Sequence, residues 1–217
     1  MTLKLAIYDL DHTLTTVDTL LLFYYELFKF KPLIILKIIL KCSQIIMQII
    51  LSQSLKFVKD NLFEPLKGLT FQEIEHISNK VLLNIKRKYY RKSIIEELVK
   101  DKQNGYKTVL LSASIENYVS KIAEDLKFDT FIATRLNFNQ NCFTGKFCTP
   151  NCKGIEKIKR LKEIEDFSQV NWKISKAYSD HHSDLPVLSL VGNAIAVSPT
   201  KKLLQIAKRR QWKIIKI

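Results

Sequence analysis

Two carboxylates stand two residues apart at the end of an apolar run near the start of the chain. The segment IYDLDHTLT, Ile7–Thr15, carries Asp9 and Asp11 and continues with Thr13. One carboxylate of such a pair can attack an electrophilic centre while the other donates or accepts a proton. The pair alone is a weak signal, because acidic residues often cap helices and turns.

Further polar residues follow other apolar runs. Ser112 ends a second run, Lys153 opens a predicted helix, and Asp180 and Asp184 follow a later run. Hydrolysis of a phosphomonoester needs a nucleophile, a proton donor, carboxylates that hold Mg²⁺, and a cation and a hydroxyl that hold the phosphate oxygens. These residue types therefore match the requirements of phosphoryl transfer.

The apolar runs predict the strands of a parallel sheet, because short and nearly continuous apolar runs are typical of strands buried on both faces. We expect the strands at Leu3–Tyr8, Tyr106–Ser114, Phe128–Ala133, Trp172–Asp180 and Asn193–Ser198. The accompanying helices are expected at Ser93–Gln103, Ile115–Leu126, Lys153–Ile164, Asp184–Leu190 and Lys201–Arg210. This alternation predicts an α/β fold with a Rossmann-like doubly wound parallel sheet, whose ligands bind beyond the carboxyl ends of the strands.

A long interval separates the first two predicted strands. Residues 16–104 read as helix almost throughout, which is too long for a plain crossover. We therefore expect a helical cap domain at residues 17–91, inserted into a catalytic core of residues 1–16 and 92–217. Thr134–Phe147 has polar turn residues between short alternating runs and predicts a β-hairpin beside the sheet.

With these motifs in this order, the chain resembles the haloacid dehalogenase superfamily, in its phosphoserine-phosphatase-like branch. The motifs are DLDHT from Asp9, LLSAS from Leu110, CKGIEK around Lys153 and YSDHHSDLPVL from Tyr178. The resemblance covers nearly the whole chain. Ser179 and His181 stand where many relatives have glycines, which affects the flexibility of that loop more than its chemistry.

The resemblance implies a phosphatase that works through an aspartyl-phosphate. Asp9 would be the nucleophile, and Asp11 would protonate the leaving alkoxide and then activate water. Ser112 and Lys153 would hold the phosphate. One carboxyl must then stay protonated beside another that stays ionised, which a metal ion on Asp9 favours.

The resemblance also implies a Mg²⁺ cofactor. Its ligands would be the side chains of Asp9 and Asp180 and the backbone carbonyl of Asp11. Asp184 would orient the metal shell, and Thr13 would support the nucleophile loop.

Composition limits the partners. The chain has 217 residues, of which 47% are hydrophobic, so it can bury a core and hold an insertion. Lys and Arg outnumber Asp and Glu by 35 to 21, and the resulting formal charge of +14 attracts phosphorylated substrates, acidic lipids or nucleic acid. We expect a small-molecule or lipid phosphomonoester as substrate. A phosphotransferase using the same intermediate is one alternative, and a membrane-associated scaffold that retains the fold is another.

The cysteines indicate the compartment. Cys42, Cys142, Cys148 and Cys152 lack CxxC spacing, and the sequence shows no secretory leader. We therefore expect reduced thiols in a cytoplasmic protein. Zinc binding by the last three is a weaker alternative, because their spacing fits no common ligand pattern.

The stretch KPLIILKIILKCSQIIMQIIL, Lys31–Leu51, is unusually apolar. As one helix it is long enough for a bilayer core, but Lys37, Lys41, Gln44 and Gln48 disfavour a true span and share one face. One interpretation is an amphipathic cap helix packed on the core. The other is an interfacial helix on an anionic membrane surface, peripheral at an inner membrane. The second agrees with branch members that dephosphorylate phosphatidylglycerophosphate.

Three shorter features have two interpretations each. Asp18 either contacts the substrate or caps the following helix. KRKYYRK, Lys86–Lys92, either binds nucleic acid or ends a solvated helix with its tyrosines packed inward, and we favour the helix end. His181 and His182 either bind metal or form hydrogen bonds in the last catalytic loop, and we favour the hydrogen bonds.

Overall fold

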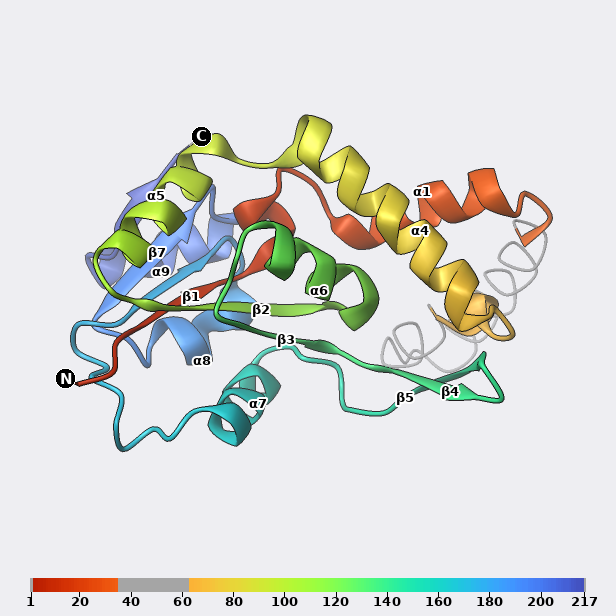
Figure 1. The fold of residues 1–217 in the computed structure, drawn as a ribbon. Helices are drawn as coiled ribbons and strands as arrows, with labels where there is room; N and C mark the ends of the chain where they lie inside the picture. The colour runs from red at the N-terminus through yellow and green to blue at the C-terminus, as the bar shows by residue number, and fades with distance from the viewer. Residues whose placement is uncertain (1, 35–62, 217) are drawn as a thin grey trace, which may run out of the picture.

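The computed structural model describes residues 2–34 and 63–216 (Figure 1). A six-stranded parallel sheet lies at its centre, in the order β3-β2-β1-β6-β7-β8. The strands are β1 (Leu5–Tyr8), β2 (Lys107–Ile115), β3 (Thr130–Thr134), β6 (Lys176–Ser179), β7 (Asn193–Val197) and β8 (Lys213–Ile215). The strand order reverses between β1 and β6, and in such sheets the ligand crevice lies at this point.

Helices cover both faces of the sheet, which confirms the predicted doubly wound α/β fold. Alternate residues of β1 enter two separate buried clusters, with Tyr8 on one face and Ile7 on the other. The first cluster includes residues of α5 (Lys92–Gln103) and α6 (Glu116–Asp125), and the second includes residues of α7 (Ile155–Ile164), α8 (Leu185–Leu188) and α9 (Lys201–Arg209).

Several predicted boundaries differ from the structure, and three of them concern segments that carry predicted site residues. The strand expected from Trp172 begins at Lys176, because Trp172 belongs to a turn in which its Nε1 donates to the Phe167 carbonyl at 3.2 Å. The helix expected from Lys153 begins at Ile155, after Gly154 with its φ of +62°. Strand β2 runs beyond Ser112 to Ile115.

The described part of the predicted cap is helical. It contains α1 (Thr19–Phe30), η2 (Glu64–Leu66), α4 (Phe71–Asn84) and η3 (Ile85–Tyr89), with α1 and α4 side by side (Figure 1). Apart from residues 31–34, the apolar stretch Lys31–Leu51 lies outside the described residues, so both interpretations of it stay predictions. Within residues 2–34 and 63–216, no helix combines the length and apolar character needed to cross a bilayer.

Helix α4 packs on α6 of the sheet layer. Glu75 of α4 pairs with Lys121 of α6 at 2.7 Å and accepts a hydrogen bond from Asn117 at 2.9 Å. Phe23 of α1 and Ile77 of α4 belong to the same buried cluster as the α6 residues. The helical insertion and one face of the sheet therefore share a continuous hydrophobic core.

The segment Lys86–Lys92 connects this insertion to α5. Its cations Lys86, Arg87 and Lys88 are exposed, while Tyr90 is partly buried and its hydroxyl donates to Asp125 at 3.1 Å. The exposed cations and the partly buried Tyr90 agree with the solvated helix end that we favoured for this segment over nucleic-acid binding.

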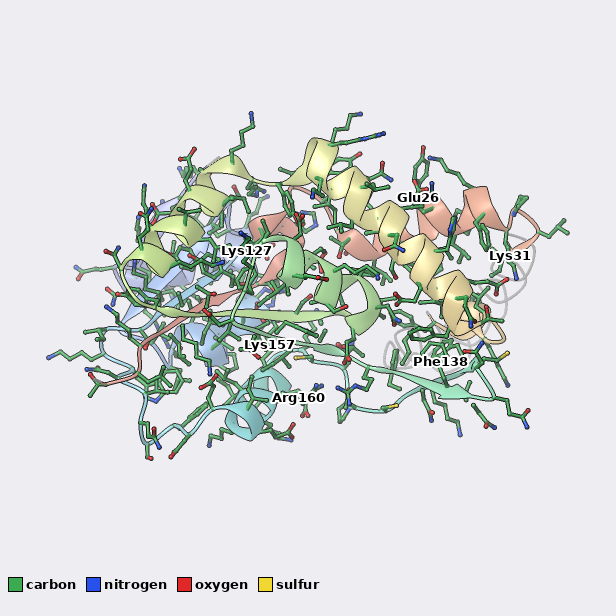
Figure 2. All side chains as sticks on the ribbon, viewed as in Figure 1. Glu26, Lys31, Lys127, Phe138, Lys157 and Arg160 are labelled. Carbon is green, nitrogen blue, oxygen red and sulfur yellow. The ribbon has the colours of Figure 1, made fainter. Side chains whose placement is uncertain are left out.

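The predicted hairpin is present as β4 (Leu136–Asn139) and β5 (Cys142–Phe147), which pair antiparallel. It packs against the helical insertion rather than beside the sheet (Figure 2). The Phe143 amide donates to the Leu69 carbonyl at 2.8 Å, and the ring of Phe138 lies 5.4 Å from that of Phe71. The hairpin is therefore attached to the insertion that we expected to be separate from it.

Candidate active site

A cavity of about 310 Å³ lies beyond the carboxyl ends of β1 and β6. Six of the eight predicted site residues line it: Asp9, Asp11, Asp18, Lys153, Asp180 and Asp184. The sheet topology explains the convergence, because adjacent parallel strands end at the same edge.

Asp9 directly follows β1. Its amide donates to the Tyr178 carbonyl of β6 at 3.0 Å, and its Oδ1 accepts from Lys157 Nζ at 2.7 Å. The Thr13 hydroxyl lies 3.4 Å from Oδ2, the supporting position we expected. Burial raises the pKa of Asp9 to about 8; the Lys157 ammonium opposes this shift, and the charge of Asp184 adds to it.

Lys157 is a site residue that our reading of the motifs missed. Lys157 belongs to α7, and its side chain lies between this helix and the sheet (Figure 2). The side chain is only 4% exposed, and its Nζ is 2.7 Å from both Asp9 Oδ1 and Asp184 Oδ2. Burial lowers the pKa of Lys157, but the two carboxylates outweigh burial and hold it above its usual range. The ammonium therefore stays charged at neutral pH.

The expected lysine, Lys153, is exposed on the cavity wall and forms no ion pair in the described part of the chain. Lys153 and Lys157 are four residues apart, a spacing that would put both on one face of a helix, but Lys153 precedes α7 and Gly154 turns the chain between them with a φ of +62°. A contact of Lys153 with the reacting phosphate stays a prediction, and the buried geometry favours Lys157 for that role.

Asp11 lies in η1 (Leu10–Leu14), a single irregular turn. Its Oδ1 accepts from the amide and the hydroxyl of Thr19, both at 2.6 Å, and its Oδ2 accepts from Ser114 Oγ at 2.7 Å. Burial raises the pKa of Asp11 and the charge of Asp18 adds to this, while the hydrogen bonds from Thr19 and Ser114 oppose it. Thr19 and Ser114 are therefore orienting residues that the sequence motifs did not identify.

His12 makes the turn after Asp9 possible. It has a φ of +55°, a conformation that residues other than glycine seldom adopt and that often occurs at functional sites. The Thr15 amide donates to the Leu10 carbonyl at 3.0 Å and closes the turn. Asp9 and Asp11 consequently both face the cavity.

Asp180 and Asp184 follow β6. Asp184 Oδ2 accepts from Lys157 and, at 2.8 Å, from Ser179 Oγ. Burial raises the pKa of Asp180 to about 6, and the charge of Asp184 adds to the shift. His181 Nδ1 bonds to the hydroxyl and the amide of Ser183, which confirms the hydrogen-bonding interpretation of that histidine.

Two of the predicted site residues, Ser112 and Asp18, form hydrogen bonds that support the local backbone. Ser112 is fully buried within β2 and does not line the cavity; its Oγ accepts from the Ser114 amide at 3.0 Å, so phosphate binding by Ser112 stays a prediction. Asp18 caps α1 by accepting from the amides of Leu20 and Leu21, which confirms the capping interpretation. Its contact with a substrate stays a prediction.

The donor set fits Mg²⁺. The implied ligands are hard oxygens of Asp9, Asp180 and the Asp11 carbonyl, the donor type this ion prefers. Burial raises the pKa of both Asp9 and Asp180 even though Lys157 opposes the shift, so a further cation at these oxygens would favour their charged forms. Among the described residues no three His, Cys, Asp or Glu side chains cluster as metal ligands, but this set requires only two side chains and a carbonyl.

The three described members of the proposed zinc alternative, Cys142, Cys148 and Cys152, are free thiols. Cys148 is exposed while Cys152 is buried, and burial raises the pKa of Cys152 to about 11. A thiol with a raised pKa is a poor metal ligand at neutral pH, so these positions do not favour zinc.

Comparison with known proteins identifies relatives. A phosphoserine phosphatase from Mycobacterium tuberculosis is 30% identical over 110 residues, which are 51% of this chain and 36% of that protein. The chain thus spans little more than a third of the length of that relative. A probable phosphatase from the same organism is 27% identical over 214 residues, 97% of this chain and 74% of that protein.

The fold agrees with these relatives. A substrate-bound phosphoserine phosphatase structure superposes with a TM-score of 0.69 at 20% identity, covering 99% of this chain and 93% of that one. The model of the haloacid dehalogenase-like hydrolases matches residues 6–189, which is most of the chain. The protein therefore belongs to the haloacid dehalogenase-like hydrolase family, as its motifs predict.

Proposed function

We propose that this protein is a Mg²⁺-dependent phosphomonoesterase that forms an aspartyl-phosphate on Asp9. The observation that carries the proposal is the buried Lys157 ammonium held between Asp9 and Asp184 at the edge of the sheet. A fixed cation beside a carboxylate nucleophile offsets the charge of an incoming phosphoryl group. The phosphatases among the relatives support the same reaction class.

In the first step, a carboxylate oxygen of Asp9 attacks phosphorus and the bond to the leaving oxygen breaks. Asp11 donates its proton to the leaving alkoxide, for which its raised pKa suits it. Lys157 stays charged beside the phosphoryl oxygens. The products are a phosphoryl group on Asp9, a free alcohol and the carboxylate of Asp11.

In the second step, the Asp11 carboxylate takes a proton from a water molecule whose oxygen attacks phosphorus. The bond to Asp9 breaks, which releases inorganic phosphate and restores both carboxyl groups. The side chains of Asp9 and Asp180 and the Asp11 carbonyl would hold Mg²⁺, which supplies positive charge against the phosphoryl oxygens when bound.

We take residues 17–91 as the cap and residues 1–16 and 92–217 as the catalytic core. Asp18, Leu20 and Phe63 line the cavity from the cap. These side chains would contact the leaving group, whether it belongs to a small molecule or to a lipid.

Phosphate release by the wild type and by Asp9→Asn tests the proposal. The panel holds phosphoserine, sugar phosphates, nucleotides and phosphatidylglycerophosphate in micelles, each with Mg²⁺ and with a chelator. We expect Mg²⁺-dependent release by the wild type, none by Asp9→Asn, and unchanged release by the exposed control variant Asp166→Asn. Release by Asp9→Asn at the wild-type rate would overturn the proposal.

A further inference from the structure

Two lysines of the described chain line the cavity, and one of them forms ion pairs with carboxylates. Lys157 is buried between Asp9 and Asp184, whereas Lys153 is exposed to the cavity and has no ion pair within the described parts of the chain. In the proposed reaction, the Lys157 ammonium already offsets the charge of the reacting phosphoryl group. Lys153 therefore has a charge that the proposed reaction does not use.

The main chain on both sides of Lys153 is held in place. The preceding residue, Cys152, is fully buried, and its amide donates to Thr134 Oγ1 at 3.2 Å. The following residue, Gly154, has a φ of +62°, and a Cβ there would lie 3.6 Å from the Ser183 carbonyl. The Lys153 side chain thus projects from a fixed backbone, which reduces the entropy cost of binding a ligand.

A second donor lies on the same cavity. The Ser183 amide donates to His181 Nδ1 at 3.1 Å, so in the neutral ring the proton is on Nε2, which has no acceptor within residues 2–34 and 63–216. His181 and Lys153 line the same cavity. Asn151 lines the cavity as well.

We propose that Lys153, together with His181 and Asn151, forms a subsite for a second anionic group on the leaving group of the substrate. That group is a carboxylate, which accepts charge-assisted hydrogen bonds from an ammonium. The inference rests on the proposed phosphatase function and adds a specificity determinant to it. The cap residues Asp18, Leu20 and Phe63 offer an acid and two apolar side chains, none of which would bind an anion.

The test compares matched ligands that differ in one charged group. The pairs are 3-phosphoglycerate against glycerol 3-phosphate, and O-phosphoserine against O-phosphoethanolamine. Calorimetry with the Asp9→Asn protein in Mg²⁺ gives the dissociation constant of each ligand without turnover. We expect the carboxylate-bearing member of a pair to bind about tenfold more tightly or better, the range of a charge-assisted hydrogen bond.

In the Asp9→Asn background, Lys153→Met is expected to reduce the ratio of the two dissociation constants within a pair to below about twofold. Lys153→Arg is expected to retain the ratio. Lys159→Met is the matched control, because Lys159 is an exposed lysine of α7, six residues after Lys153, that pairs with Glu156. It should leave the ratio unchanged.

Equal affinity within both pairs, or no measurable binding of the carboxylate-bearing members, would overturn the subsite. So would an equal loss for both members in Lys153→Met, which would instead assign Lys153 to the reacting phosphate. These outcomes are separate from phosphate release. If Asp9→Asn abolishes release while both members bind equally, the phosphatase function stands and the subsite does not.

Discussion

Lys157 and Asp9 form an ion pair at the floor of the cavity, with 2.7 Å between Nζ and Oδ1, although 148 residues separate them in the chain. The same Nζ is 2.7 Å from Asp184. One buried cation thus joins the end of β1, helix α7 and the turn after β6. We therefore expect the local stability of the site and its chemistry to depend on the same contact.

Replacing Lys157 by Met should therefore affect both properties. Two buried carboxylates would lose their common partner, and we expect the free energy of unfolding to fall by about 3 to 5 kcal/mol. Phosphate release should fall by about 10² to 10³-fold, the usual cost of removing a charge-stabilising donor. Urea unfolding and phosphate assays measure the two effects. The control Lys153→Met should unfold like the wild type, and a Lys157→Met protein with wild-type stability and rate would contradict the account.

We expect the loss of rate on replacing Thr19 to depend on how much the leaving group of the substrate needs a proton. Thr19→Val removes the hydroxyl that donates to Asp11 at 2.6 Å, so the general acid would be less well oriented. We expect kcat/KM, which covers phosphoryl transfer to Asp9 but not hydrolysis of the intermediate, to fall by about 10 to 10²-fold for an alkyl phosphate. For p-nitrophenyl phosphate, whose leaving group needs no proton, we expect kcat/KM to fall by less than about threefold. Thr19→Ser should restore the alkyl rate. Equal losses on both substrates would indicate a merely structural role for Thr19.

We expect Asp180 to make the folding stability of the metal-free protein depend on pH. Its pKa in the folded state is raised to about 6, so the folded protein binds more protons than the unfolded chain between about pH 4 and 6. Stability should fall as the pH rises through this window and then stay lower. In chelator at pH 8, Asp180→Asn should be more stable than the wild type by on the order of 1 to 3 kcal/mol. At pH 4 the difference should disappear, and a constant difference across the range would contradict the assignment.

Asp101 should support the fold without taking part in the reaction. It is fully buried, and it accepts from the hydroxyls of Tyr8 at 2.7 Å and Tyr178 at 2.9 Å, whose rings stack 4.2 Å apart. Asp101→Leu would leave two buried hydroxyls and Lys176 without their acceptor, at a cost of about 3 kcal/mol or more. Calorimetric melting would show the loss, while the rate per folded molecule should stay unchanged. A selective loss of rate with normal melting would contradict this role.

The sheet and the convergence of Asp9 and Asp180 were predictable from the sequence. Buried parallel strands leave a strong apolar signal, and their common carboxyl edge follows from the topology. The choice between Lys153 and Lys157 was not predictable, because residues four apart share one face of a helix and the sequence did not reveal that α7 begins only after Lys153.

Contacts between distant elements also left no sequence signal. Thr19 and Ser114 reach Asp11 from α1 and from the end of β2. Ser114 closes the LLSAS motif, in which only Ser112 was given a role, and nothing in the segment of Thr19 marks it as a partner of Asp11. The hairpin could be recognised from its turn residues, but its attachment to the cap depends on tertiary contacts such as that of Phe138 with Phe71.

The most direct test of the central claim is to look for the phosphoryl group on Asp9. The wild type is mixed with a radiolabelled phosphomonoester and Mg²⁺, quenched rapidly in acid and digested, and the labelled peptide is identified by mass spectrometry. We predict acid-stable, base-labile label on the peptide that contains Asp9, and none in Asp9→Asn. Phosphate release by the wild type without label on that peptide, or label that persists in Asp9→Asn, would contradict the mechanism.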